Sequence, residues 1–176
     1  MPVRRTRGAI RTAGRQLGDE LSAGDLVTAE LLMENETFMV CIALSRAFQV
    51  SAENAADYGL KADGMYVDPA DGRQTWDTRW MGKVKVGDWC VKVRKFEWQQ
   101  AGSTYYTLTD KEFLCFTDEL RCRVPAEDFT EAPLRKSARI SANSDDCHGY
   151  KMSVRYKMSA ELKNRMLALV PDDNEV

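Results

Sequence analysis

The chain has 176 residues, of which 44% are hydrophobic and 30% are charged, and its net charge is −2. This length and composition favour one folded domain with a sizeable core and exclude a chain that is disordered throughout. No run of 18 apolar residues occurs, so no transmembrane helix is expected. The arginine-rich amino terminus is not followed by the apolar segment of a secretory signal.

Charge is distributed unevenly along the chain. Residues 1–18 contain five arginines and no acid, residues 19–80 contain twelve acids and four bases, and residues 135–170 contain eight bases and three acids. Basic ends around an acidic middle favour contact between the ends and a polyanion. The alternative is a solvated surface with no partner.

Residues 1–18 predict a flexible basic arm, because arginines interleaved with glycine, alanine and threonine have little to bury. Such an arm is suited to contact phosphates, and a linker or a transit peptide is the alternative. We predict a single β-rich domain across residues 19–170 and an acidic disordered tail at residues 171–176.

Residues 26–32 and 37–44 predict a hairpin with its turn at residues 34–36. In the second segment both alternating sets of side chains are apolar, which is typical of a central strand buried on two faces. Ser51 is suited to cap a short helix over residues 52–58, which the following glycine would end.

Residues 61–82 are interpreted as a loop, because glycine, proline and aspartate recur there. Trp76 and Trp80, with Asp77 between them, are candidates for an aromatic pocket that binds a cation. The alternative is a loop that folds back and places these rings in the core.

Residues 83–124 carry the strongest β signal in the chain. Apolar and mostly charged side chains alternate from Trp89 to Arg94, which is typical of a half-buried antiparallel strand. Turn residues near 87–88, 99–104 and 109–111 divide the stretch into a four-stranded meander. A lone meander leaves one face bare, so it must curl into a barrel or pack on another layer.

The carboxy-terminal part predicts one strand and one helix. Residues 151–157 alternate between mostly basic and apolar side chains, so the strand has a basic outer face. Ser159 is suited to cap a helix over residues 160–169, which Pro171 stops. Its apolar stripe consists of Leu162, Met166 and Leu169.

These elements predict a mainly β (α+β) fold. We expect a small antiparallel β-barrel or a strongly curled meander, with a short internal helix and a C-terminal helix.

The five cysteines lack the close paired spacing of structural zinc sites. Cys90, Cys115 and Cys122 lie in predicted strands, so we expect reduced, metal-free and mostly buried thiols in an intracellular protein, nuclear or cytoplasmic. A zinc site formed by these three residues and His148 is the alternative. Cys147 and His148 are adjacent in a loop, which makes them a poor catalytic pair.

No nucleotide-binding, metalloprotease or hydrolase motif occurs in the chain. We therefore predict no enzyme activity, no catalytic residue and no cofactor. A cysteine-dependent or metal enzyme is the weakest of the hypotheses.

The sequence favours a non-enzymatic binding module that engages a nucleic acid or a protein tail, in a chromatin or RNA-associated setting and away from membranes. The candidate recognition aromatics are Trp76, Trp80, Trp89 and Trp98. The candidate phosphate contacts are Arg4, Arg5, Arg7, Arg135, Lys136, Lys151, Arg155 and Lys157.

The alternative is a structural or assembly protein. It would dock on a protein partner or on a second copy through exposed aromatics and the C-terminal helix. The oligomeric state does not follow from the sequence.

Overall fold

The computed structural model describes residues 7–33, 36–78, 82–98, 105–132, 147–151 and 154–169. The helices are α1 (Arg7–Glu20) and α2 (Ala160–Ala168), and the short 3₁₀ turns are η1 (Ala55–Tyr58), η2 (Ala62–Gly64), η3 (Thr117–Glu119) and η4 (Ala126–Asp128). The strands are β1 (Leu26–Met33), β2 (Glu36–Ala43), β3 (Phe48–Gln49), β4 (Met65–Val67), β5 (Gln74–Thr78), β6 (Gly82–Lys85), β7 (Trp89–Trp98), β8 (Tyr105–Phe116), β9 (Leu120–Arg123), β10 (Phe129–Ala132) and β11 (Arg155–Met158).

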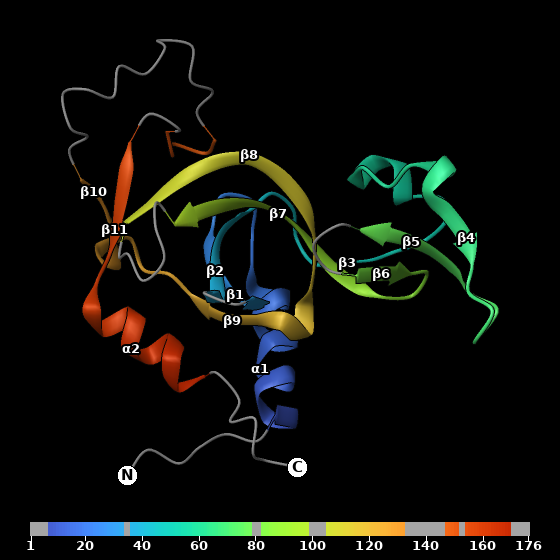
Figure 1. Cartoon of the computed structure of the whole chain (residues 1–176), viewed down its shortest axis with the longest axis horizontal. Coiled ribbons are helices and arrows are strands. Elements are labelled where there is room, and N and C mark those ends of the chain that lie inside the picture. The colour runs from blue at the N-terminus through green and yellow to red at the C-terminus, as the bar shows by residue number, and fades with distance from the viewer. Residues whose placement is uncertain are drawn as a thin grey trace.

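A curled antiparallel sheet forms most of the molecule. Its strand order is β10-β11-β8-β7-β2-β1-β9, with β3 paired to β7 beside this path. The sheet bends into a half-barrel, with α2 below it and α1 near β9 (Figure 1). The predicted mainly β fold, with a curled antiparallel sheet and a C-terminal helix, is confirmed.

Strand β2 is buried on both of its faces, as its sequence predicts. Phe38, Val40 and Ile42 join one core cluster together with residues of α2. Met39 and Cys41 point to the other face and join a second cluster, which Leu21 and Leu17 complete at the end of α1. The two helices therefore cover opposite faces of the same central strand.

Residues 61–82 are not the loop that the sequence predicted, because they contain β4, β5 and the first residue of β6, which form a second, three-stranded sheet with the order β4-β5-β6. The Asp68 carboxylate accepts the N–H of Ala70, and the Asp68 N–H donates to Arg73, so the glycine-containing stretch between β4 and β5 is a tight hairpin turn. Trp76 lies in the middle strand and is 3% exposed. The alternative interpretation, that this ring fills the core, is the correct one for Trp76.

Strand β8 is continuous, and the turn predicted at residues 109–111 is wrong. Between the pairs Arg94–Glu112 and Phe96–Leu108, β7 contributes one residue whereas β8 contributes three. The Thr109 hydroxyl donates to the carbonyl of Lys95 at 2.6 Å, which holds the extra residues against the ladder. The turn-forming residues thus produce a bulge within a strand pair rather than a reversal of the chain.

The predicted fourth strand of the meander forms, but it has a different neighbour. After β8 the chain makes the η3 turn, and β9 pairs with β1 instead of β8. The turns predicted near residues 87–88 and the hairpin of β1 and β2 are present. The predicted loop at residues 99–104 lies outside the described residues.

Helix α1 replaces most of the predicted arm, since residues 7–18 are helical. Gly14 and Gly18, which suggested a flexible segment, are contact points instead. A Cβ atom on Gly14 would lie 2.6 Å from the Leu120 carbonyl oxygen, and one on Gly18 would lie 2.9 Å from the Thr117 side chain. The two glycines let α1 approach the backbone of η3 and β9 closely. Residues 1–6 and the predicted tail at 171–176 lie outside the described residues.

Of the two other predicted helices, α2 begins at its expected cap, whereas the residue before η1 is Asn54 rather than the expected Ser51. The Ser159 hydroxyl accepts the N–H of Leu162 at 3.1 Å and begins α2. The predicted helix over residues 52–58 shortens to the single 3₁₀ turn η1, which ends at Gly59 with a φ of 86°. The apolar stripe of α2 is buried, because Leu162 and Met166 complete the core under the half-barrel.

Candidate functional site

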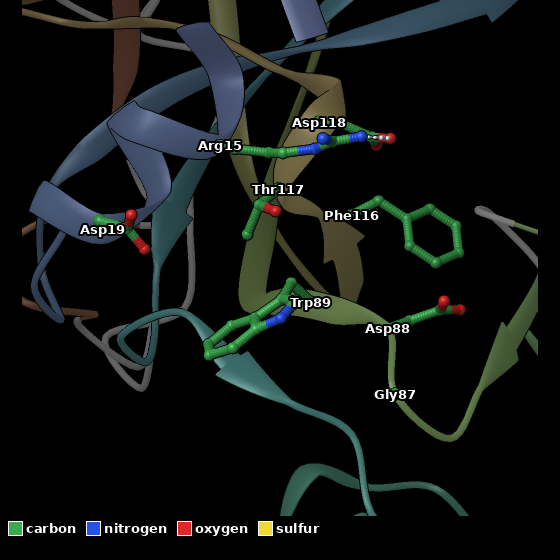
Figure 2. A pocket seen from close by; sticks show the side chains of 8 residues that line it. All are labelled: Arg15, Asp19, Gly87, Asp88, Trp89, Phe116, Thr117 and Asp118. Atoms are coloured by element: carbon green, nitrogen blue, oxygen red, sulfur yellow. Dashed lines mark ion pairs between the residues drawn. The ribbon is translucent and has the colours of Figure 1, made fainter. Parts of the chain in front are cut away.

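A cleft with a volume of about 640 Å³ opens between the second half of α1 and the adjoining ends of β7 and β8 (Figure 2). Three separate parts of the chain meet there: the helix, the turn before β7, and the η3 corner. The residues that line it are Arg15, Asp19, Gly87, Asp88, Trp89, Phe116, Thr117 and Asp118.

The turn before β7 holds one wall of the cleft in place. Gly87 has a φ of 98°, a conformation that favours glycine. The Asp88 carboxylate accepts the N–H of Lys85 at 2.8 Å, and the Gly87 N–H donates to the carbonyl of Val50 at 2.8 Å. Trp89 therefore follows a rigid turn, which fixes the starting point of its side chain.

Trp89 is 51% exposed, although most of the residues that follow it in β7 are buried. Among the Phe, Tyr and Trp side chains that the structure describes, that of Trp89 is the most exposed, and the others are buried or half-buried. Burial of such a large ring would normally stabilise the fold, so an exposed ring at the edge of a cleft marks a surface suited to recognition.

The cleft carries more negative than positive charge. Asp19, Asp88 and Asp118 contribute three carboxylates, and Arg15 contributes the one cation among the lining residues. Arg15 lies 3.8 Å from Asp118 and is largely exposed, so this pair is a weak surface interaction. A π face together with carboxylates attracts a cation.

Of the two candidate tryptophans whose side chains the structure describes, Trp76 and Trp89, only Trp89 lines the cleft. Trp76 is buried in the core between the two sheets. The hypothesis that its ring lines an aromatic pocket was therefore wrong. Trp80 and the side chain of Trp98 lie outside the described residues, although β7 extends to position 98. The structure therefore does not bring the four rings together as one site.

The predicted basic face of the last strand is present. Arg155 and Lys157 alternate with the buried Tyr156 and Met158 along β11, so the two cations share its outer side. The Arg155 guanidinium lies 4.6 Å from the centre of the Tyr105 ring. Among the other candidate cations, Lys151 is exposed. Arg4, Arg5, Arg135, Lys136 and the side chain of Arg7 lie outside the described residues.

The thiols are unsuited to nucleophilic chemistry. All five cysteines are unpaired, and all except the half-exposed Cys122 are buried. Burial raises the pKa of both Cys41 and Cys90 to about 12, so neither forms a thiolate near neutral pH. His148 is exposed beside the buried Cys147. Within the described ranges, no three His, Cys, Asp or Glu residues are grouped to hold a metal ion.

Sequence reasoning missed the cleft because its walls come from segments that were interpreted as an arm and a turn. The available signal was the spacing of Ile10, Leu17 and Leu21, which places three apolar side chains on one helical stripe. Nothing in the local sequence indicated that η3 would lie against that helix.

Comparisons of the chain with models of protein families, with curated proteins and with solved structures found no match in any of the three. Of the two helices that the structure describes, neither has the length and apolar character needed to cross a membrane.

Proposed function

We propose that the protein is a non-enzymatic binding module whose cleft accepts a cationic side chain, lysine or arginine, from the tail of a protein partner. The observation that carries the proposal is the exposed Trp89 ring in a cleft with three carboxylates. A cation placed over an indole face gains electrostatic attraction that a neutral side chain lacks.

The dimensions of the cleft fit a side chain rather than a folded domain. Its volume of about 640 Å³ lies within the range usual for small-molecule sites. The Thr117 hydroxyl and the Asp118 carboxylate, on the wall opposite the turn of β7, are suited to accept hydrogen bonds from an ammonium or guanidinium group (Figure 2).

The test uses a short labelled glycine–serine peptide carrying two arginines, followed by fluorescence anisotropy. The Trp89→Ala and Asp118→Asn variants should each weaken binding about fivefold or more, because each removes one attractive group. Val67→Ala is the matched control, since Val67 is exposed on β4 and does not line the cleft. A peptide with two glutamates should not bind. Equal affinity for wild type and Trp89→Ala would reject the proposal.

A second candidate function is binding of single-stranded nucleic acid on the outer face of β8 and β11, in a chromatin or RNA-associated setting within the nucleus or cytoplasm. Its support is the Arg155–Tyr105 contact, with Lys157 paired to Tyr105 in register. Aromatic and cationic side chains on an open sheet face suit stacked bases and phosphates.

Anisotropy with a labelled oligonucleotide at two salt concentrations tests this second candidate. Lys157→Ala should weaken binding and flatten the salt dependence, since one phosphate contact contributes a slope near −0.9 on duplex DNA and about −0.7 on single strands. The Trp89→Ala variant should leave this binding unchanged. No anisotropy change at low salt would reject it.

The assembly alternative has less support, because the apolar stripe of α2 packs inside the molecule. Leu162 and Met166 are buried, and Leu167, which is 49% exposed, is the large apolar side chain that α2 still presents. Light scattering over a range of protein concentrations tests self-association directly.

A further inference from the structure

A cluster of charged side chains lies behind the cleft, where η3 leads into β9. Glu119 belongs to η3, Glu30 to β1 and Arg121 to β9. The Arg121 guanidinium, which belongs to a side chain only 4% exposed, donates to the Glu30 carboxylate and lies 3.8 Å from that of Glu119. Two carboxyl groups thus share one buried cation, and they are also hydrogen-bonded to each other.

This cluster is connected to the wall of the cleft through Asp118. Arg121 donates to the main-chain carbonyl of Asp118 at 2.8 Å, which holds the η3 turn. The side chain of the same residue lines the cleft and faces Arg15 from α1. A change of charge on Glu119 is therefore adjacent to the cation-binding wall.

Glu119 is the member of the cluster that changes charge near neutral pH. Burial, followed by the hydrogen bond to Glu30, raises the pKa of Glu119 to about 7. The charges of Glu30 and Asp118 act in the same direction, whereas Arg121 opposes them. From β8, the buried Cys115 thiol also faces the cluster, and burial raises its pKa well above the ordinary value, so it stays protonated.

We propose that the proton shared by Glu119 and Glu30 regulates the affinity of the cleft for a cation. This inference rests on the proposed function of the cleft. Loss of the proton adds one negative charge beside Asp118, so a bound cation is held more tightly as the pH rises. By linkage, the bound cation raises the acid dissociation constant of Glu119 by the same factor by which deprotonation tightens binding, so the pKa of Glu119 falls.

The binding experiment compares the two-arginine peptide at about pH 6 and about pH 8, one unit on either side of the Glu119 pKa. Arginine stays charged throughout, so a peptide with a blocked amino terminus does not itself titrate between these pH values. We expect binding to tighten about threefold between the two pH values, the size expected for unit charges that interact without contact in a partly solvated site.

Two variants distinguish the effect of Glu119 on the pH dependence of binding from the effects of other titrating groups. Glu119→Gln removes the titrating carboxyl, so this variant should bind the peptide with equal affinity at the two pH values. Glu30→Gln removes the hydrogen bond that adds to the effect of burial on the Glu119 pKa, so the change in affinity should move to lower pH. His148→Gln is the matched control, because it removes the only histidine and should retain the threefold change. Loss of the pH dependence in the His148 variant would overturn the inference.

A measurement on the wild-type protein does not depend on the folding of any variant. NMR titration of the Glu119 carboxyl carbon, with and without the peptide, should show a pKa near 7 that falls when the peptide binds. Trp89-dependent binding with equal affinity at both pH values would overturn this inference and leave the proposed function intact. Absence of peptide binding at both pH values would overturn both, and an unshifted Glu119 titration in the presence of bound peptide would overturn the inference alone.

Discussion

The two helices pack on the sheet in different ways, and the difference explains where the candidate site lies. Helix α2 inserts Leu162 and Met166 between the strands and closes the core beneath the half-barrel. Helix α1 approaches η3 and β9 through Gly14, which faces main-chain carbonyl oxygens, and through Gly18, which faces the side chains of Thr117 and Leu120. Large side chains fill the space between the elements that they join. Glycines bring two elements close together but have no side chain to fill the space beside the contact. The candidate cleft adjoins α1, the helix that packs through glycine.

The largest expected effect is on the α2 side. Leu162→Ala should lower the free energy of unfolding by about 2–5 kcal/mol, because it leaves a cavity in a fully buried position. Chemical denaturation measures the change. If the comparison holds, peptide binding to the folded variant is unaffected, since α2 does not line the cleft. The exposed Leu167→Ala is the control and should change stability by less than about 0.5 kcal/mol.

On the α1 side, Gly14→Ala should destabilise the protein by about 1–3 kcal/mol, because the new methyl group would clash with the Leu120 and Thr117 carbonyl oxygens. The same change at Gly8, where a Cβ meets nothing within 4 Å, should stabilise the helix by up to about 1 kcal/mol. Equal effects at the two glycines, measured by thermal or chemical denaturation, would contradict the close packing of α1.

The next prediction concerns Ser159, which caps the start of α2. Ser159→Ala should cost about 1 kcal/mol, since the Leu162 N–H and the Asp128 carboxylate each lose a hydrogen-bond partner. Ser159→Asp should recover part of the loss at the Leu162 N–H, although it places a second carboxylate near Asp128. An unchanged denaturation midpoint for the alanine variant would mean that packing alone defines the start of α2.

The smallest expected effect is a pH dependence of stability at the η3 corner. The pKa of Glu119 is raised from 4.5 to about 7, so between these values the folded state holds a proton that the unfolded state has released. This contribution to stability is therefore present at low pH and is lost as the pH rises from 4.5 to 7. We expect a loss of about 1 kcal/mol, a value reduced because the side chain is 27% exposed.

The difference between wild type and Glu119→Gln isolates that contribution from the other titrating groups. Denaturation at about pH 5 and about pH 8 should show a smaller decrease in stability for the variant. A variant whose stability falls as steeply as that of wild type would remove Glu119 from the explanation.

The sequence by itself determined the elements whose signals are local. The serine that begins α2, the glycine that ends η1, the Gly87 turn and the two apolar faces of β2 all act within a few residues of themselves. Their hydrogen bonds and side-chain periodicity depend little on the rest of the fold, so these elements could be predicted from the sequence. The β-rich fold class followed from them.

Tertiary structure decided which segments meet. Turn residues 109–111 became a bulge because β7 continued opposite them, and β9 paired with β1 because η3 redirected the chain. The glycines of the predicted arm became contact points only where a carbonyl-lined corner was available to receive them. Strand pairing and close backbone approach join residues far apart in sequence, and local propensity does not specify the partner. The cleft is formed by three such distant segments, so it arises only in the folded chain.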